Sequence, residues 1–259
     1  MIDKKKTLVL ALYAPEIMLK NGGETYRVED TIIRICKAAN ISYVEAFVTP
    51  TGIFISVDEG KKDEYVFSFI KRIKNRTIDL DKVSQVNDFS RRFTTTDLTI
   101  EEGMEILRKI DRAPKYNKYL RLLGAGVSSA FFAFMLQSTI YDFISSFLIG
   151  MCVYLSVAFV ENLQSNLFIQ NLIGGSVASL LAILAVYMHL GTNIDKIVIS
   201  SIMFLLPGVA ITNAVRDSIS GDLLSGLARA AEAFIIAISV AVGAGLVIKI
   251  WVQLFGGIL

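Results

Sequence analysis

The chain has 259 residues, with 26 Lys and Arg against 24 Asp and Glu, so its formal net charge is +2. The charges are unevenly divided, because 22 of the basic and 18 of the acidic residues lie within residues 1–121. This split excludes a single soluble domain, and two cysteines in different halves exclude a disulfide scaffold.

The charged part, residues 1–118, predicts a small cytoplasmic α+β domain. The elements expected in it are helices over 7–20, 24–39, 80–93 and 99–111 and strands over 42–48, 53–57 and 65–73. We expect the first helix to be interrupted or kinked near Pro15. Pro50 and Gly52 predict a turn between the first two strands.

The N-terminus superficially resembles a signal peptide, since Asp3–Lys6 precedes an apolar stretch. That stretch is short and runs into Pro15 without a convincing cleavage site, which favours a soluble helix. Acidic residues interleave with the basic ones, so no nucleic-acid partner is expected. No P-loop and no Cys/His set with metal-ligand spacing occurs, so we expect no enzyme, cofactor or metal site.

Residues 119–259 predict a domain of five transmembrane helices. They carry few charges, and the uncharged runs between them approach the 20 or so apolar residues that a bilayer core requires. The expected spans are 121–139, 142–160, 168–190, 195–214 and 231–254. The alternative is the buried helical core of a soluble fold, in which five such runs in succession are uncommon.

Basic residues predict the orientation of these spans. Immediately before the first span come Arg108, Lys109, Arg112, Lys115, Lys118 and Arg121. Such a cluster stays in the cytoplasm, so the N-terminus is expected inside and the C-terminus outside. A loop over 215–230 then falls inside.

The segment from Pro207 to Glu232 is the predicted substrate or coupling-ion site. Its candidate residues are Pro207, Gly208, Asn213, Arg216, Asp217, Asp222, Ser225, Arg229 and Glu232. Pro207 and Gly208 break the fourth span, and broken helices free backbone groups at membrane depth. Ionisable groups at span ends usually face the bundle interior or a water-filled cavity. The alternative is a cytoplasmic loop with a proline kink and local ion pairs.

Small residues recur along the fifth span and predict a packing face. They are Gly226, Ala230, Ala233, Ala237, Ala241 and Gly245. A face of this length requires a close neighbour, either within the chain or in a partner.

Two stretches, Leu19–Ala39 (LKNGGETYRVEDTIIRICKAA) and Pro207–Ala233 (PGVAITNAVRDSISGDLLSGLARAAEA), resemble the threonine/serine exporter family. The hairpin sequence VTPTGIFISV matches as well, so the likeness covers nearly the whole chain. Long members of that family fuse a second set of membrane helices after the fifth span, whereas this chain stops there. It is similar to the split branch, whose bacterial members pair with a separate small membrane protein and have been linked to succinate export.

The resemblance implies a subunit of a secondary exporter in a bacterial-type inner membrane. The expected cargo is a small hydrophilic carboxylate, either a threonine/serine-type amino acid or a dicarboxylate such as succinate. The expected partner is a small membrane protein, in an oligomer, with proton coupling through a carboxylate of raised pKa as one option. The alternative is a membrane-anchored regulatory or scaffold protein that binds a partner through its cytoplasmic domain.

Four cations of the membrane half could meet a substrate carboxylate. Lys196 and Lys249 are expected near the outer surface, which leaves Arg216 and Arg229. The family-like residues Arg27, Glu29 and Asp30 fit either a salt-bridged surface helix or a docking site onto the membrane half.

Overall fold

The computed structural model describes residues 4–41, 43–58, 67–74, 76–114 and 116–256. The chain forms two compact units. The first unit combines residues 1–114 with 208–231, and the second combines residues 115–207 with 232–259. A late segment of the sequence therefore folds with the N-terminal part of the chain.

The first unit contains the predicted mixture of helices and strands. In chain order its N-terminal elements are α1 (Lys4–Lys20), α2 (Thr25–Ala38), β1 (Tyr43–Thr49), β2 (Gly52–Asp58), β3 (Phe67–Arg72), α3 (Leu80–Thr95) and α4 (Ile100–Arg112). The strands form one antiparallel sheet in the order β1-β2-β3. Pro50 and Thr51 form the tight turn between β1 and β2. Positions 42, 65 and 66 of the predicted strands lie outside the described residues.

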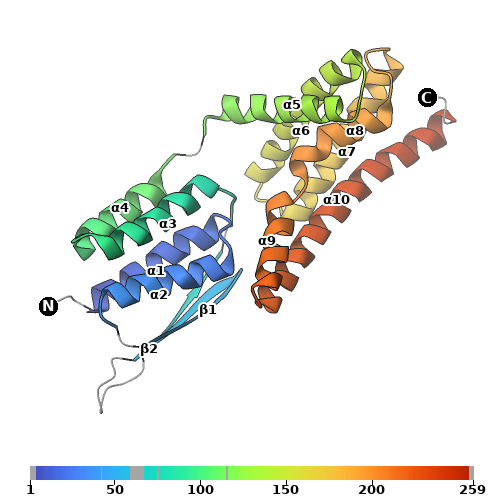
Figure 1. The fold of residues 1–259 in the computed structure, drawn as a ribbon. Helices are drawn as coiled ribbons and strands as arrows, with labels where there is room; N and C mark the ends of the chain where they lie inside the picture. The colour runs from blue at the N-terminus through green and yellow to red at the C-terminus, as the bar shows by residue number, and fades with distance from the viewer. Residues whose placement is uncertain (1–3, 42, 59–66, 75, 115, 257–259) are drawn as a thin grey trace. The chain divides into compact units, whose positions relative to one another are not determined.

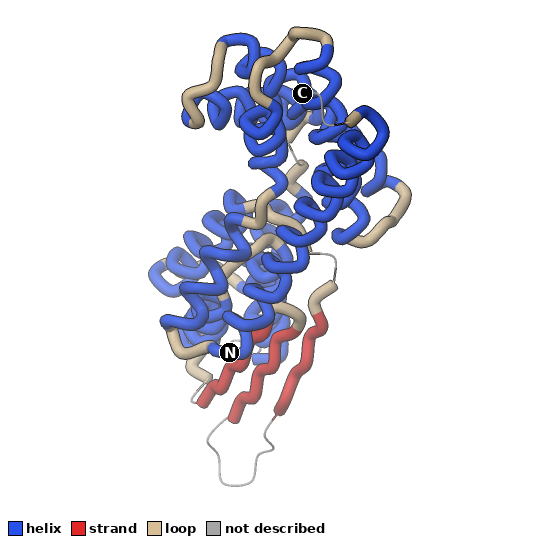
Figure 2. Tube along the Cα trace, turned by 90° about the vertical axis from the view of Figure 1, so that its right-hand side faces the viewer, coloured by secondary structure: helices blue, strands red, loops and turns tan. Residues whose placement is uncertain are grey.

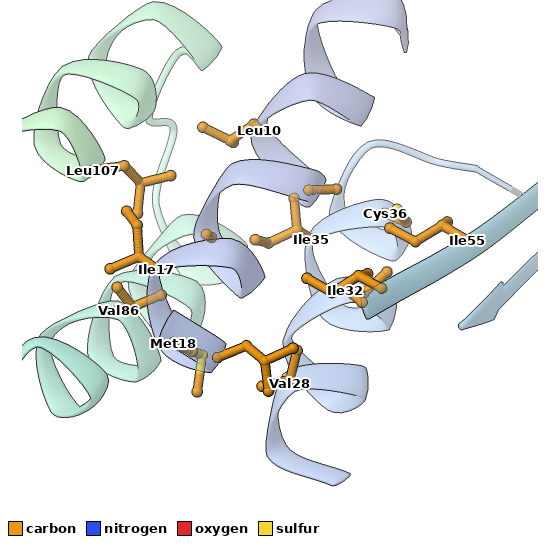
Figure 3. Packing of buried hydrophobic residues seen from close by; sticks show 14 of the residues in the cluster. Leu10, Ile17, Met18, Val28, Ile32, Ile35, Cys36, Ile55, Val86 and Leu107 are labelled. Carbon is orange, nitrogen blue, oxygen red and sulfur yellow. The ribbon is translucent and has the colours of Figure 1, made fainter. Parts of the chain in front are cut away.

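The helices of this part cover one face of the sheet and leave the other face open (Figures 1 and 2). α1 and α2 lie between the sheet and the pair formed by α3 and α4 (Figure 1). Alternate strand residues such as Val48 and Ile53 point inward and are fully buried. Figure 3 shows Ile17 of α1 beside Leu107 of α4 on one side of α1, and Ile35 of α2 on the other side of this helix, within the same core.

The predicted interruption at Pro15 does not occur, since α1 continues through this residue. A proline inside a helix removes one backbone hydrogen bond and costs about 3 kcal/mol. Ala11, Ala14 and Ile17 around it are completely buried. Burial of this helix face in the core offsets the cost, which local sequence rules do not register.

The remaining elements are helical. They are α5 (Lys118–Met135), α6 (Ile140–Asn162), α7 (Leu167–Tyr187), α8 (Ile194–Ile202), the short 3-10 helix η1 (Met203–Leu205), α9 (Gly208–Ile219) and α10 (Leu223–Phe255). α9 and the start of α10, to Ala231, belong to the first unit, and the rest belongs to the second. The second unit is thus entirely helical over its described residues.

Three of the described helices, α6, α7 and α10, are long and apolar enough to cross a membrane. A fourth span results if the bent pair Ile194–Leu205 and Gly208–Ile219 is counted as one. α5 is long enough but not apolar enough by the same measure, because Lys118 and Arg121 lower the mean hydropathy of its eighteen residues. Over its described residues the chain is therefore mostly helical, with three to four apolar helices that could cross a membrane and a small sheet.

Asp142 joins two turns of the second unit. Its carboxylate accepts hydrogen bonds from the backbone N–H groups of Thr139, Thr192 and Asn193, and from the Thr192 hydroxyl. The Thr139 hydroxyl accepts in return from the Asp142 N–H, which completes a capping box at the start of α6. This buried charge is satisfied and fixes the turn before α6 to the turn before α8.

The face of α10 that packs inside the chain differs from the predicted stripe. Ala230, Ala237, Ala241 and Gly245 are exposed in the chain, whereas Gly226 and Ala233 are buried. The buried small residues of the second unit also include Ser239, Gly243 and Ala244. A Cβ at Gly243 would lie 2.0 Å from the Leu172 carbonyl oxygen, so glycine there lets α7 and α10 approach closely.

Candidate functional site

The segment after the break at Pro207 is a helical hairpin and not the loop expected over 215–230. α9 ends at Ile219 and α10 begins at Leu223. Gly221 adopts φ +94°, a left-handed conformation that glycine accepts without strain. The tight turn brings the polar residues of both helices to the same end of the hairpin.

One polar side of α9 faces the connection between α1 and α2. Asn213 and Asp217, one helical turn apart as predicted, are both buried. The Asn213 amide donates a hydrogen bond of 2.8 Å to the Gly22 carbonyl oxygen. Gly22 itself has φ +92°, so the chain turns sharply between α1 and α2 and exposes its carbonyl groups.

Asp217 and Arg229 form the buried centre of the site. The Arg229 Nε lies 3.0 Å from Asp217 Oδ2, and the two side chains are 7% and 0% exposed. Arg229 Nη2 donates to the Gly23 carbonyl oxygen at 2.7 Å, and the Thr25 N–H donates to Asp217 Oδ1 at 3.2 Å. A buried ion pair is tolerated only where further hydrogen bonds satisfy it, and here the backbone after Gly22 supplies them.

Further contacts surround this pair. The Thr25 hydroxyl donates to Asp222, and the Ser225 hydroxyl donates to the Val48 carbonyl oxygen. Arg216 pairs with the buried Glu24, although the arginine side chain itself remains 52% exposed. Six of the nine predicted residues, Asn213, Arg216, Asp217, Asp222, Ser225 and Arg229, therefore meet the N-terminal part of the chain.

Glu29 contributes a further carboxylate on α2. It is half-buried and accepts a hydrogen bond of 2.9 Å from the Val48 N–H. Burial raises the pKa of Glu29, and the nearby carboxylates of Asp222 and Asp217 raise it further, against the Val48 hydrogen bond. Of the other two family-like residues, Arg27 pairs with Glu24 and Asp30 pairs with Arg34 on the same helix.

The other three predicted residues are Gly208, Pro207 and Glu232. Gly208 begins α9 with open space where a Cβ would lie, so its glycine is not required by packing. Pro207 and Glu232 belong to the second unit. Over the described ranges, no group of three or more His, Cys, Asp or Glu side chains is arranged to hold a metal ion.

Sequence reasoning did not assign Glu24 and Thr25 to the site, nor the backbone of Gly22 and Gly23. These residues lie 191 to 206 positions before their partners, and only the resemblance of both stretches to one family connected them. The signal was the pair of glycines between two amphipathic helices, followed at once by an acidic and a hydroxyl residue.

The geometry distinguishes the two arginines chemically. Arg229 is enclosed and its guanidinium is committed to Asp217 and Gly23. Arg216 is half exposed and pairs with one carboxylate among the described residues, that of Glu24, so its guanidinium has further donors for a second carboxylate. Arginine suits such a role because its planar fork matches a carboxylate with two parallel hydrogen bonds.

Comparisons with known proteins give a consistent family. The family model described as "Putative threonine/serine exporter" matches residues 9–251. The "Probable threonine/serine exporter" of Mycobacterium tuberculosis is 22% identical over 93% of this chain and 46% of its own length. The "Threonine/serine exporter" of Corynebacterium glutamicum is also 22% identical, over 93% of this chain and 50% of its own.

A shorter relative matches from end to end. The "Probable succinate transporter subunit YjjP" of Klebsiella aerogenes is 22% identical over 96% of this chain and 95% of its own length. The chain spans about half the length of the two threonine/serine exporters and nearly all of this subunit. No solved structure matches the chain.

Proposed function

The chain belongs to the threonine/serine exporter family, and from this premise we propose that it is one subunit of a secondary exporter of small hydrophilic carboxylates. The cargo is a threonine/serine-type amino acid or a dicarboxylate such as succinate. A separate small membrane protein completes the transporter. This assignment is supported by the end-to-end match to a relative named as a subunit, alongside longer relatives of twice the length.

We further propose that the protein lies in the inner membrane of a bacterium, with residues 1–118 in the cytoplasm. In this arrangement residues 119–259 cross the membrane five times, with α5 counted as the first span. Lys118 and Arg121 then mark the cytoplasmic end of α5, where basic residues are favoured.

The segment from Pro207 to Glu232 is the proposed substrate or coupling-ion region. The observation that supports it is the buried contact of Asp217 and Arg229 with Gly23 and Thr25. A simple membrane anchor has no need of an enclosed charge pair, which is costly to desolvate. In the proposed mechanism Asp217 and Arg229 hold α9 and α10 against the connection between α1 and α2. The exposed side of the Arg216 guanidinium then binds the substrate carboxylate.

Counterflow in vesicles tests this function. The purified chain, with and without the partner, is reconstituted into vesicles that are loaded with unlabelled L-threonine or succinate. Uptake of the labelled compound into these vesicles is then measured. Arg216→Lys keeps the charge but loses the fork, so we expect export to fall roughly tenfold at matched membrane abundance. The matched control is Arg34→Lys, which changes a pair with Asp30 and a hydrogen bond to Ser90, away from Arg216, and should leave export unchanged at matched abundance.

The same experiment distinguishes the exporter from the alternative, a membrane-anchored scaffold protein. If the chain transports neither compound with the partner present, the proposed export function is wrong. Binding of a soluble partner to the same preparation would then indicate a membrane-anchored scaffold. Normal export by Arg216→Lys would instead keep the function and remove Arg216 from the site.

A further inference from the structure

The interior of the second unit contains serine hydroxyls that helix geometry does not explain. A serine inside a helix ordinarily returns its hydroxyl to a carbonyl oxygen one turn earlier. Ser176 and Ser239 do so, bonding the carbonyl oxygens of Leu172 and Ile235. Ser129 of α5 and Ser201 of α8 do not, although both residues are completely buried. Among the described residues their hydroxyl oxygens have no hydrogen-bond partner.

Two further completely buried serines, Ser146 and Ser200, lie on α6 and α8. We call the four residues Ser129, Ser146, Ser200 and Ser201 of helices α5, α6 and α8 the serine cluster. The Ser146 and Ser200 hydroxyls lie 2.8 Å apart and connect α6 to α8. Ser201 follows Ser200 on α8, about 100° further around the helix, and all four residues are completely buried.

A glycine brings the α5 hydroxyl to the same place. A Cβ at Gly150 of α6 would lie 2.2 Å from Ser129 Oγ, so only glycine leaves room for this hydroxyl against α6. Gly150 is one helical turn after Ser146, on the same side of α6. The Ser129 hydroxyl therefore lies between α5 and α6, and both of these helices also pack against α8.

Unpartnered hydroxyls in a buried interior carry a cost. A buried polar group without a partner loses its hydrogen bonds to water, and native proteins keep few such groups. Alanine would fit the same space without this cost. Retaining serine at Ser129 and Ser201 is explained if the hydroxyls bind something that the folded chain alone does not supply.

The position and charge of the cluster indicate the kind of ligand. Ser201 lies in the last turn of α8, directly before η1 and the break at Leu206-Pro207. Broken helices in transporters lie beside the substrate or ion path. The cluster contains no charged residue, so it offers both donors and acceptors without trapping an ion. Passage requires binding that is favourable yet weak, which suits such a site.

We propose that the serine cluster is a hydrated binding site on the path of the exported compound, where hydroxyls bind water and the polar groups of a small carboxylate. This inference rests on the proposed export function. It places part of the path among α5, α6 and α8, in residues that neither the family match nor the sequence pattern singled out.

The first test compares stability with export. In the double variant Ser129→Ala/Ser201→Ala we expect unchanged or higher thermal stability in detergent, because two unsatisfied groups are removed. Counterflow of L-threonine or succinate should fall roughly three- to tenfold at matched abundance. The control is Ser145→Ala/Ser176→Ala, whose hydroxyls bond carbonyl oxygens inside the chain. That variant should lose stability and keep its export rate per folded protein.

The second test measures water at the cluster without using transport. Ser129→Cys and Ser201→Cys, in a background lacking Cys36 and Cys152, are treated with a small hydrophilic methanethiosulfonate reagent. We expect labelling at both positions and none at Ala182→Cys, which replaces a completely buried residue of the apolar core.

The outcomes separate this inference from the proposed function. Absence of labelling at both cysteines, or normal export by the double alanine variant, overturns the serine cluster as part of the path. A wild-type protein that exports neither compound with its partner present overturns the exporter itself. Labelling at the cluster would in that case still establish a hydrated interior for a different cargo.

Discussion

At the scale of single residues, the ion pairs of this protein differ sharply in how far they are buried. Asp217 is completely buried with Arg229, whereas Asp30 pairs with Arg34 at the surface with its side chain 56% exposed. Exposed pairs contribute little, because water screens them and two long side chains must be ordered. The enclosed pair is therefore the one whose loss should affect the fold.

We expect Asp217→Ala to lower the free energy of unfolding by about 3–5 kcal/mol, because it leaves Arg229 buried without this carboxylate. Denaturation of the detergent-solubilised full chain measures the change. Asp30→Ala is the control and should behave like the wild type. An Asp217→Ala variant as stable as the control would mean that water reaches the pair.

The raised pKa of Glu29 predicts how the stability of the fold depends on pH. Because burial raises its pKa, the folded state binds this proton more tightly than the unfolded state does. The contribution of Glu29 to stability therefore falls as pH rises from the ordinary value of 4.5 through the raised one.

In Glu29→Gln this loss should be absent, while the amide oxygen still accepts from the Val48 N–H. We expect the variant to be at least as stable as the wild type at neutral pH, with a smaller difference in acid. Thermal unfolding followed across this pH range provides the measurement. Parallel curves for the two proteins would show that Glu29 is solvated in both states.

At the scale of elements, α10 shows how packing selects one face of a helix. Small residues occur on several of its faces, and the backbone of α7 approaches the one that holds Gly243. The exposed residues Ala237, Ala241 and Gly245 remain available to a neighbour outside the chain, which agrees with the proposed subunit arrangement.

Two glycines of α10, only two positions apart, should respond oppositely to alanine. Gly243→Ala drives a methyl group into the Leu172 carbonyl, 2.0 Å away, and should separate α7 from α10 with a loss of stability. Gly245→Ala meets nothing within 4 Å and should gain up to about 1 kcal/mol from helix propensity. Thermal midpoints in detergent compare them, and equal midpoints would contradict the close approach of these helices.

At the scale of the whole molecule, the proposed topology makes opposite predictions for two reporter positions. A reporter active only outside the cytoplasm should be active when fused at the C-terminus and inactive when fused at residue 118. The reason is the basic cluster before α5, which favours the cytoplasm, followed by an odd number of spans. The same activity at both positions would require an even number of spans, such as the four that result when the bent helix pair is counted as one span beside α6, α7 and α10.

The sequence by itself determined the features that depend on local composition and spacing. Charge density separates residues 1–121 from the apolar remainder, and periodicity locates most helices and the β1-β2 hairpin to within a few residues. The break at Pro207 and the stacking of Asn213 on Asp217 follow from rules that act within one or two helical turns.

Only the tertiary structure decided which groups these residues meet. Thr25 and Asp217 are 192 positions apart, and no local spacing specifies a contact across that distance. The same holds for Pro15, whose helix persists because it is buried, and for α10, whose packing face depends on the shape of α7. Local rules describe what a segment prefers, whereas burial and complementary hydrogen bonds, which need the whole chain, determine what it does.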